Sequence, residues 1–229
     1  MKIYKTGIAN DIKNVVETNQ KPDKWDFLLE YLQGKDKSIR ILDVGCGTGN
    51  KVLLLINKGF RNTVGVEYNP EMYRKMISKH RQLKITKGNA ENLKFIKDES
   101  FDLVYCHQVL EHLPYPEKAI SEAHRVLKKN GAYAISIPNG DHLNDIFLRI
   151  IQKIVYKKYD HLQRFSLKLI SKILEENSFK IIKVSTKKNS FSLFLDPRIK
   201  FHWLSVPIYN FLKKIYWKDV GFDILAVKI

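Results

Sequence analysis

Short apolar runs alternate with longer stretches of helical periodicity along the first two thirds of the chain. The apolar runs predict five strands, at Ile39–Val44, Thr63–Glu67, Leu83–Lys87, Phe101–Cys106 and Ala132–Pro138. Between them, apolar positions three and four residues apart predict helices at Lys51–Lys58, Pro70–His80 and Pro116–Lys129, the last ended by Gly131. Strands that alternate with helices predict a doubly wound, Rossmann-like α/β fold, with a mostly parallel sheet covered on both faces.

The last third of the chain departs from this alternation. Helical periodicity predicts an amphipathic helix over His142–Lys158 and a second over Ser166–Glu176, with Ser166 as its N-cap and Asn177 or Ser178 at its end. Two further strands are predicted, at Lys180–Ser185 and Asp223–Ile229. The aromatic-rich stretch Phe191–Trp217 between them is typical of a small subdomain core, or alternatively of a wall of an acceptor pocket or a contact with a membrane surface.

Length and composition fit a single globular domain. The chain has 229 residues, of which 44% are hydrophobic. We expect a helical segment at 1–38, a cofactor-binding core at 39–139, and insertions at 140–179 and 189–221 that form a cap over an acceptor. No apolar run reaches the roughly 18 residues that a membrane span needs, and the N-terminus lacks the core of a signal peptide. With Cys46 and Cys106 too few for a disulfide framework, we expect a cytoplasmic location.

The charge balance is strongly basic, with a formal net charge of +16. Such a charge attracts nucleic acid, anionic lipid or acidic substrates. The excess is spread as single lysines along polar faces, however, so nucleic-acid binding remains possible but is not favoured.

The sequence ILDVGCGTGN at Ile41–Asn50 places glycines on alternate positions directly after a strand. A strand that runs into such a turn and then a helix lets the backbone approach a ligand at the carboxyl end of the sheet. The spacing G-x-G-x-G is not the dinucleotide fingerprint G-x-G-x-x-G, which argues against an NAD-dependent dehydrogenase, and no Lys–Ser/Thr pair completes a P-loop. Asp43 would repel a phosphate but attract a cationic amine.

Residues after the next strands supply the rest of a nucleoside site. Glu67 ends the second strand, where a carboxylate accepts hydrogen bonds from both hydroxyls of a ribose. Asn89 and Ala90 follow the third strand and can border an adenine, and Cys106 and His107 follow the fourth. A ribose, an adenine and a cationic amine without a phosphate describe S-adenosylmethionine, whose demethylated product is S-adenosylhomocysteine.

The sequence resembles the class I S-adenosylmethionine-dependent methyltransferases, in the branch that includes the ubiquinone and menaquinone biosynthesis enzymes. The resemblance rests on ILDVGCGTGN, VGVEYNPEM, GNAENLKF and the stretch from Phe101 to Asn139. It implies seven strands in the order 3-2-1-4-5-7-6, with the seventh antiparallel. It also implies that the methionine end contacts Asp43, Gly45 and Gly47. The family usually has Asp where Asn89 stands, so here the side-chain carbonyl would face the adenine amino group.

From these motifs together we expect one set of cofactor-binding residues: Asp43, Gly45, Cys46, Gly47, Gly49, Glu67, Tyr68, Asn89, Ala90, Glu91, Cys106 and His107.

The sequence LEH at Leu110–His112 suggests acid–base chemistry, because histidine titrates near neutrality and Glu111 could orient it. Some ubiquinone O-methyltransferases of the family carry magnesium on Glu-x-x-Glu-His at this place. Here Gln108 replaces the first glutamate, and Mg²⁺ prefers carboxylate and water oxygens. We therefore expect no metal, and a role for Glu111 and His112 in fixing the loop by hydrogen bonds.

The stretch DHLQRFS at Asp160–Ser166 resembles the family's entry to the helix before strand six, which lies near the acceptor; capping and loop anchoring explain it equally well. Methyl transfer from a sulfonium is an in-line displacement that needs alignment above all. We expect transfer to an oxygen or nitrogen atom of a small-molecule, lipid-like or glycan acceptor, with His112, His142 or His161 as the base. The alternatives are an RNA or protein methyltransferase and a non-catalytic module that binds S-adenosylmethionine.

Overall fold

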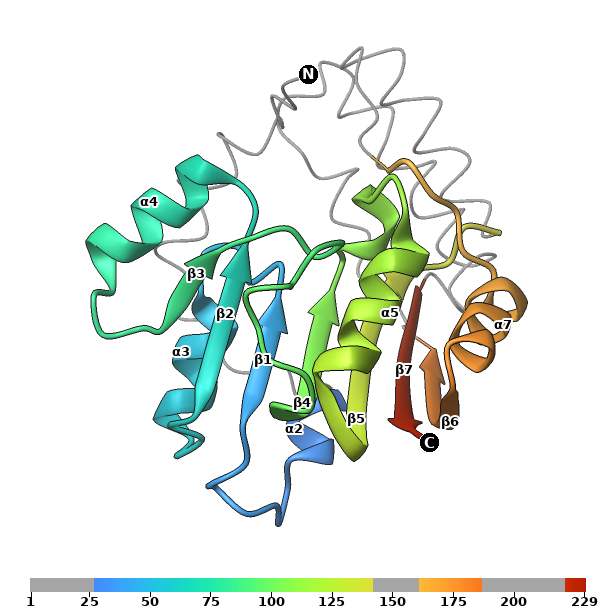
Figure 1. Ribbon diagram of the computed structural model, residues 1–229, viewed down its shortest axis with the longest axis horizontal. Helices are drawn as coiled ribbons and strands as arrows, with labels where there is room; N and C mark the ends of the chain where they lie inside the picture. The colour runs from blue at the N-terminus through green and yellow to red at the C-terminus, as the bar shows by residue number, and fades with distance from the viewer. Residues whose placement is uncertain (1–26, 142–160, 187–220) are drawn as a thin grey trace, which may run out of the picture. The chain divides into compact units, whose positions relative to one another are not determined.

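The computed structural model describes residues 27–141, 161–186 and 221–229 (Figure 1). The chain divides into two compact units, 1–35 and 36–229. The short helix α2 (Phe27–Tyr31) belongs to the first unit, and every other element described here belongs to the second.

The second unit is built on a seven-stranded sheet in the order β3-β2-β1-β4-β5-β7-β6. The five parallel strands are β1 (Ile41–Val44), β2 (Thr63–Glu67), β3 (Ile85–Lys87), β4 (Phe101–His107) and β5 (Leu127–Pro138). Strand β7 (Gly221–Lys228) runs antiparallel between β5 and β6 (Phe179–Thr186). The expected strand order and the antiparallel seventh strand are confirmed.

Helices lie against both faces of this sheet. Helix α5 (Pro116–Val126) crosses in front of β4 and β5 in Figure 1, and α3 (Asn50–Asn57) lies behind β2. The largest core cluster joins buried residues of α5 and of α7 (Leu167–Glu176) to alternate strand positions such as Val104 and Ile135. Strands β1 and β2 are buried along nearly their whole length, as expected for strands covered on both sides, whereas the edge strand β3 is exposed at Thr86 and Lys87.

Several helix ends follow the capping chemistry that the sequence indicates. Asn69 caps α4 (Pro70–Lys79) by accepting from Glu71 N and Met72 N, and proline occupies the first turn. Ser166 caps α7 through a 3.0 Å bond from Leu169 N, and α7 ends at Asn177 with Ser178 at φ 58°. Both expectations for this helix are confirmed.

The prediction that α5 runs to Lys129 and is ended by Gly131 is wrong. The helix ends at Val126, and Leu127 already pairs with Phe101 as the first residue of β5. Asn130 takes the left-handed conformation, at φ 61°, and Lys128 Nζ lies 2.7 Å from Asp102 Oδ1. Burial of Leu127 beside β4 outweighs the helix propensity of the Leu-Lys-Lys sequence, because propensity differences are small beside tertiary packing.

Three predicted features lie wholly or largely outside the described residues: the helical segment at 1–38, of which 27–38 are described, the helix over 142–158, which includes His142, and the aromatic stretch 191–217. Among the described helices, none is both long and apolar enough to cross a bilayer.

Candidate functional site

The carboxyl ends of the parallel strands gather the predicted cofactor residues at one edge of the sheet. Strands β1, β2 and β4 are in register side by side, so Val44, Val66 and Cys106 occupy one row. The turns that follow these strands therefore meet at the same edge, where open α/β sheets bind ligands.

The three glycines after β1 all adopt left-handed backbone conformations, with φ of 75° at Gly45, 55° at Gly47 and 73° at Gly49. A Cβ at Gly45 would lie 2.4 Å from Val109 Cγ2, and one at Gly49 would lie 2.6 Å from Met76 Sδ. At Gly47 the nearest atom would be Met72 Cε at 3.4 Å. Gly45 and Gly49 thus leave room for neighbouring side chains, and at Gly47 a Cβ would be in van der Waals contact with Met72; at all three positions the positive φ favours glycine.

Glu67 joins the glycine turn to the second strand. Its Oε2 accepts a 2.7 Å hydrogen bond from Gly47 N, and its Oε1 accepts a 2.7 Å bond from Asn69 N. Each carboxylate oxygen keeps a second lone pair. The side chain is therefore fixed by the backbone and still able to accept two hydroxyl donors.

Asp43 lies on β1 directly before the turn and is only 3% exposed. Burial raises the pKa of this carboxyl to about 7; the Lys51 cation opposes the rise and the Glu67 carboxylate adds to it. A cationic amine placed beside Asp43 would offset the cost of ionising this buried acid.

The raised pKa of Asp43 makes the stability of the cofactor-free protein depend on pH. The folded protein keeps the proton up to about pH 7, whereas the unfolded chain releases it near the ordinary aspartate pKa of 3.8. Because the folded state binds more protons between these values, the free energy of unfolding should fall as pH rises from about 4 to about 7. In thermal melting curves from about pH 4 to pH 8, the stability of Asp43→Asn should not show this decrease as pH rises. At pH 8 its melting temperature should be higher than that of the wild type. Equal pH slopes in the two proteins would contradict the assignment.

The turn after β3 carries the residues expected at the adenine. Asn89 Oδ1 accepts from Glu91 N at 2.9 Å, and Ala90 is buried. Glu91 reaches instead to the loop before α5, where its Oε1 accepts from Tyr115 N at 2.6 Å. Asn89 and Ala90 therefore lie at the edge, while the Glu91 side chain fixes a loop.

The two cysteines are placed differently from the rest of the predicted set. Cys46 is buried, and a Cβ on Gly65 would lie 2.7 Å from its Sγ. Cys106 is 1% exposed and belongs to the core cluster beneath α5. Burial raises the pKa of both thiols. Their side chains are packing groups, so a ligand would reach these positions through the backbone.

Tyr68 and His107 are exposed at the same edge, and the imidazole of His107 lies 6.0 Å from the Tyr105 ring.

A row of polar residues that was not predicted from the sequence crosses four strands and begins at His107. His107 pairs with Ser136 on β5, Ser136 pairs with Asp223 on β7, and Asp223 pairs with Ser185 on β6. Ser136 and Asp223 are both buried. In the sequence, the available signal was a polar residue within each apolar run. The register of the strands places these residues side by side, and the sequence does not give that register.

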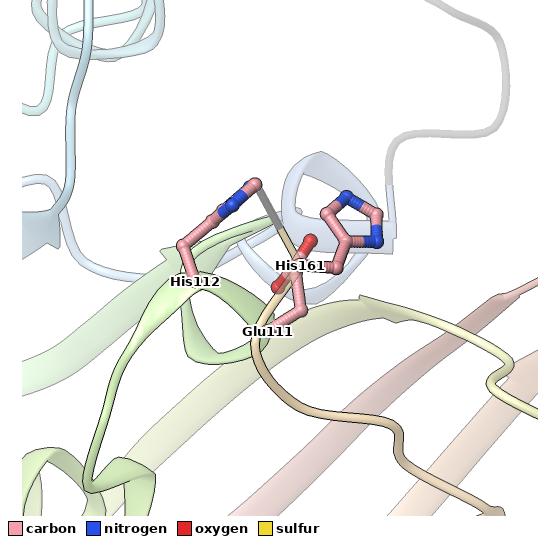
Figure 2. Close-up of side chains that lie close together, drawn as sticks. All are labelled: Glu111, His112 and His161. Atoms are coloured by element: carbon pink, nitrogen blue, oxygen red, sulfur yellow. The ribbon is translucent and has the colours of Figure 1, made fainter. Parts of the chain in front are cut away.

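A cluster of Glu111, His112 and His161 lies beyond the end of β4 (Figure 2). Glu111 and His112 belong to the short 3₁₀ helix η2 (Leu110–His112), and Glu111 is fully buried. His161 precedes α7, and its ring packs edge-on against His112 with centroids 4.8 Å apart. The structure thus brings together two of the three histidines expected as bases.

The segment before α7 is anchored by the residues of the DHLQRFS stretch. Arg164 donates from Nε to Gly140 O at 3.0 Å and bonds the same oxygen through Nη2, and Gly140 N donates to Phe165 O at 2.9 Å. Phe165 is buried in the core. Arg164 and Phe165 therefore tie the end of β5 to the entry of α7, which is the anchoring alternative.

The residues at this edge fit a nucleoside that carries a cationic amine. The buried Asp43 carboxyl suits an ammonium group, and Glu67 offers two oriented acceptors. In the described glycine turn, no hydrogen bond comes from a lysine or arginine side chain that could hold a phosphate.

Comparison with known proteins agrees with this geometry. A family model described as a methyltransferase domain matches residues 42–135. An uncharacterized protein of Methanocaldococcus jannaschii is 35% identical over 64% of this chain and 67% of its own length. A ubiquinone/menaquinone biosynthesis C-methyltransferase of Nitrobacter hamburgensis is 32% identical over 49% of each chain. The crystal structure of an S-adenosylmethionine-dependent methyltransferase from Archaeoglobus fulgidus has the same fold, with a TM-score of 0.65, 23% identity, and coverage of 88% of this chain and 91% of that one.

Proposed function

The chain belongs to the S-adenosylmethionine-dependent methyltransferases, and from this premise we propose that it methylates an oxygen or nitrogen atom of a small-molecule, lipid-like or glycan acceptor. The observation that carries the cofactor assignment is the Glu67 carboxylate, whose two oxygens are fixed by hydrogen bonds from Gly47 N and Asn69 N. S-adenosylmethionine would supply a methyl group on a sulfonium: an acceptor atom in line attacks the methyl carbon, the carbon–sulfur bond breaks, and the thioether of S-adenosylhomocysteine leaves. The chain's own task is to hold both partners in line.

We assign each part of the cofactor to residues at the carboxyl edge. Glu67 accepts from the ribose hydroxyls, Asp43 faces the amino group, and the backbone of Gly45 and Gly47 follows the methionine end. Asn89 and Ala90 border the adenine, with Tyr68 and His107 exposed beside them. A buried carboxyl with a pKa near 7 and a carboxylate held by two N–H donors support these roles.

The acceptor is proposed to approach from the side of the Glu111, His112 and His161 cluster. Val109, one residue before η2, would meet a Cβ at Gly45, so the cluster and the glycine turn are neighbours. A lipid-like acceptor is supported by the relative named for ubiquinone and menaquinone biosynthesis. That relative is a C-methyltransferase, whereas two imidazoles and a carboxylate suit an acceptor that loses a proton from oxygen or nitrogen.

The test is formation of S-adenosylhomocysteine from S-adenosylmethionine with a panel of phenolic quinols, sterols, sugars and small amines. We expect turnover with a member of the panel, a product carrying one added methyl group, and loss of turnover in Glu67→Gln. Turnover only with RNA, together with retention on RNA that falls steeply as salt rises, would favour nucleic-acid methylation instead. Tight cofactor binding without product from any acceptor would favour a binding module.

A further inference from the structure

We propose that Glu111, His112 and His161 form a binding site for one divalent transition-metal ion, with Zn²⁺ as the best fit. One ligand atom from each side chain can be chosen so that all three lie within 4.8 Å of one another (Figure 2). Ligand atoms about 2.0–2.2 Å from a four-coordinate zinc ion lie somewhat closer together than this, so the two imidazoles would have to rotate toward the ion when it binds.

The backbone that carries the three groups is held in place without a metal. Leu162 N and Gln163 N both donate to Glu111 O, at 2.7 and 3.0 Å. Gln163 Nε2 also donates to Leu113 O and Pro114 O, each at 3.3 Å. These bonds join the segment that bears His161 to the loop around η2. A site whose ligands are fixed by their surroundings loses less freedom when the ion binds.

The donor set decides the class of ion. Two imidazole nitrogens and one carboxylate suit zinc and its neighbours in the first transition row, whereas Mg²⁺ and Ca²⁺ take oxygen ligands. Glu111 is fully buried, and a cation beside a buried carboxylate offsets the cost of its desolvation. His112 and His161 are only partly buried, which gives an ion a path to solvent.

This ligand set differs from the Glu-x-x-Glu-His magnesium motif. Gln108 would stand at the first glutamate, but its backbone adopts φ 54° and its N–H donates to Ser136 O at 2.8 Å. Gln108 Nε2 lies 3.5 Å from the same oxygen, so the side chain turns toward β5. The third ligand comes instead from His161, which is distant in sequence, and the expectation of no metal is replaced by this proposal.

Three protein ligands leave a coordination position for water or for an acceptor. Zinc lowers the pKa of a bound hydroxyl-bearing group, so the ion would ease loss of the acceptor proton while the histidines act as ligands rather than as bases. This consequence rests on the proposed function; metal binding itself does not.

The experiment uses the full-length protein, stripped with a chelator and then titrated with Zn²⁺ against a chromophoric competitor. We expect one ion per chain by elemental analysis, no displacement by millimolar Mg²⁺, and a visible Co²⁺ absorption spectrum typical of four-coordinate sites. Each of His112→Gln and His161→Gln should weaken Zn²⁺ binding at least tenfold. His80→Gln, at the end of α4, is the matched control and should bind as the wild type does.

Binding of S-adenosylmethionine, measured by calorimetry, reports folding of each variant separately from its metal affinity. A wild type that binds no zinc, or histidine variants that bind it with unchanged affinity, would overturn the proposal. A wild type that does not bind S-adenosylmethionine would instead refute the proposed function. Glu111→Gln should also weaken Zn²⁺ binding; should this variant fail to fold, the two histidine variants and the Co²⁺ spectrum still decide the outcome.

Discussion

Replacement of Glu67 by glutamine should lower the affinity for S-adenosylmethionine by about 100-fold, as measured by calorimetric titration. The glutamate accepts from Gly47 N and Asn69 N through different oxygens. In glutamine one of these oxygens becomes an NH₂ group, which would face a backbone donor. Two charge-assisted hydrogen bonds to the ribose would also weaken, and each such bond contributes about 1.5–3 kcal/mol.

Glu71→Gln is the matched control for this prediction, because it removes the same charge nearby. Glu71 lies in the first turn of α4 and forms an exposed pair with Lys75, with 3.2 Å between Nζ and Oε1. We expect cofactor affinity within about twofold of the wild type, since exposed pairs contribute little. A Glu67→Gln protein that melts normally and binds the cofactor as tightly as Glu71→Gln does would refute the ribose assignment.

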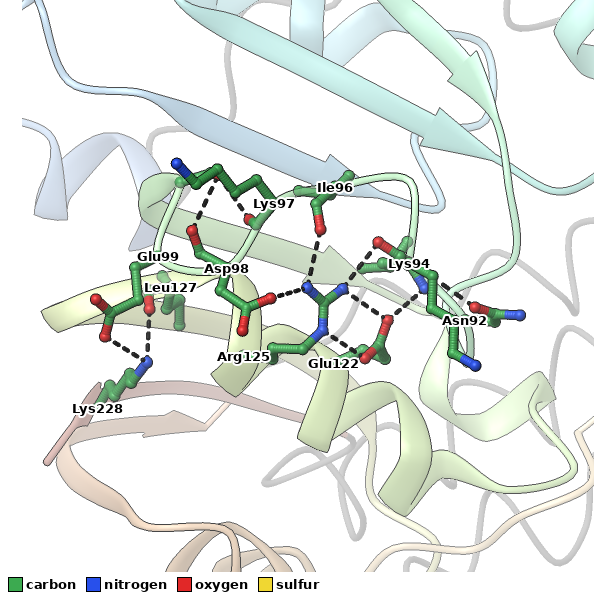
Figure 3. Close-up of polar contacts among 12 residues, drawn as sticks. Asn92, Lys94, Ile96, Lys97, Asp98, Glu99, Glu122, Arg125, Leu127 and Lys228 are labelled. Carbon is green, nitrogen blue, oxygen red and sulfur yellow. Dashed lines mark hydrogen bonds and ion pairs between the residues drawn. The ribbon is translucent and has the colours of Figure 1, made fainter.

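Arg125→Met should lower the free energy of unfolding by about 3 kcal/mol, because it removes a set of partly buried hydrogen bonds. Arg125 on α5 bonds the carbonyl oxygens of Leu93 and Ile96, each at 2.8 Å, and the carboxylates of Asp98 and Glu122 (Figure 3). Glu122 in turn accepts from Leu93 N. The guanidinium thus holds the 93–98 loop on the helix, and its hydrogen bond holds the pKa of the Glu122 carboxyl below its usual value.

Lys128→Met provides the comparison for Arg125→Met in urea unfolding at pH 7. It removes a single ion pair between Lys128 and Asp102, and these side chains are 44% and 31% exposed, respectively. We expect a loss of about 1 kcal/mol or less. Equal losses in the two variants would mean that the Arg125 network contributes no more than one surface pair.

The order of elements was readable from the sequence because burial on both faces of a parallel sheet leaves a simple pattern. Apolar runs such as Thr63–Glu67 were predicted as strands, and Ser166 before an amphipathic stretch was predicted to begin a helix. The glycine turn was also readable, because left-handed backbone at three alternate positions leaves glycine as the residue without strain.

Element ends were less predictable where pairing competes with local propensity. Leu127–Lys129 favours a helix by itself and becomes strand because Leu127 is buried beside Phe101 of β4. The side-chain roles of Cys46, Cys106 and Glu91 were equally hidden. The two thiols fill the core, and Glu91 accepts a hydrogen bond from the backbone N–H of Tyr115. Neither role depends on the residues that are adjacent in sequence.

The alternation of strands and helices, the glycine turn and the acids at Asp43 and Glu67 could be predicted from the chain alone, since each depends on residues close together or on a repeated pattern; the strand order was predicted from the family resemblance. The contact of His161 with Glu111 and His112, and the row of His107, Ser136 and Asp223, became visible in the folded structure alone. The reason is physical: hydrogen bonds between segments about fifty residues apart, and the register of four strands, fix these distances, and no local pattern encodes them.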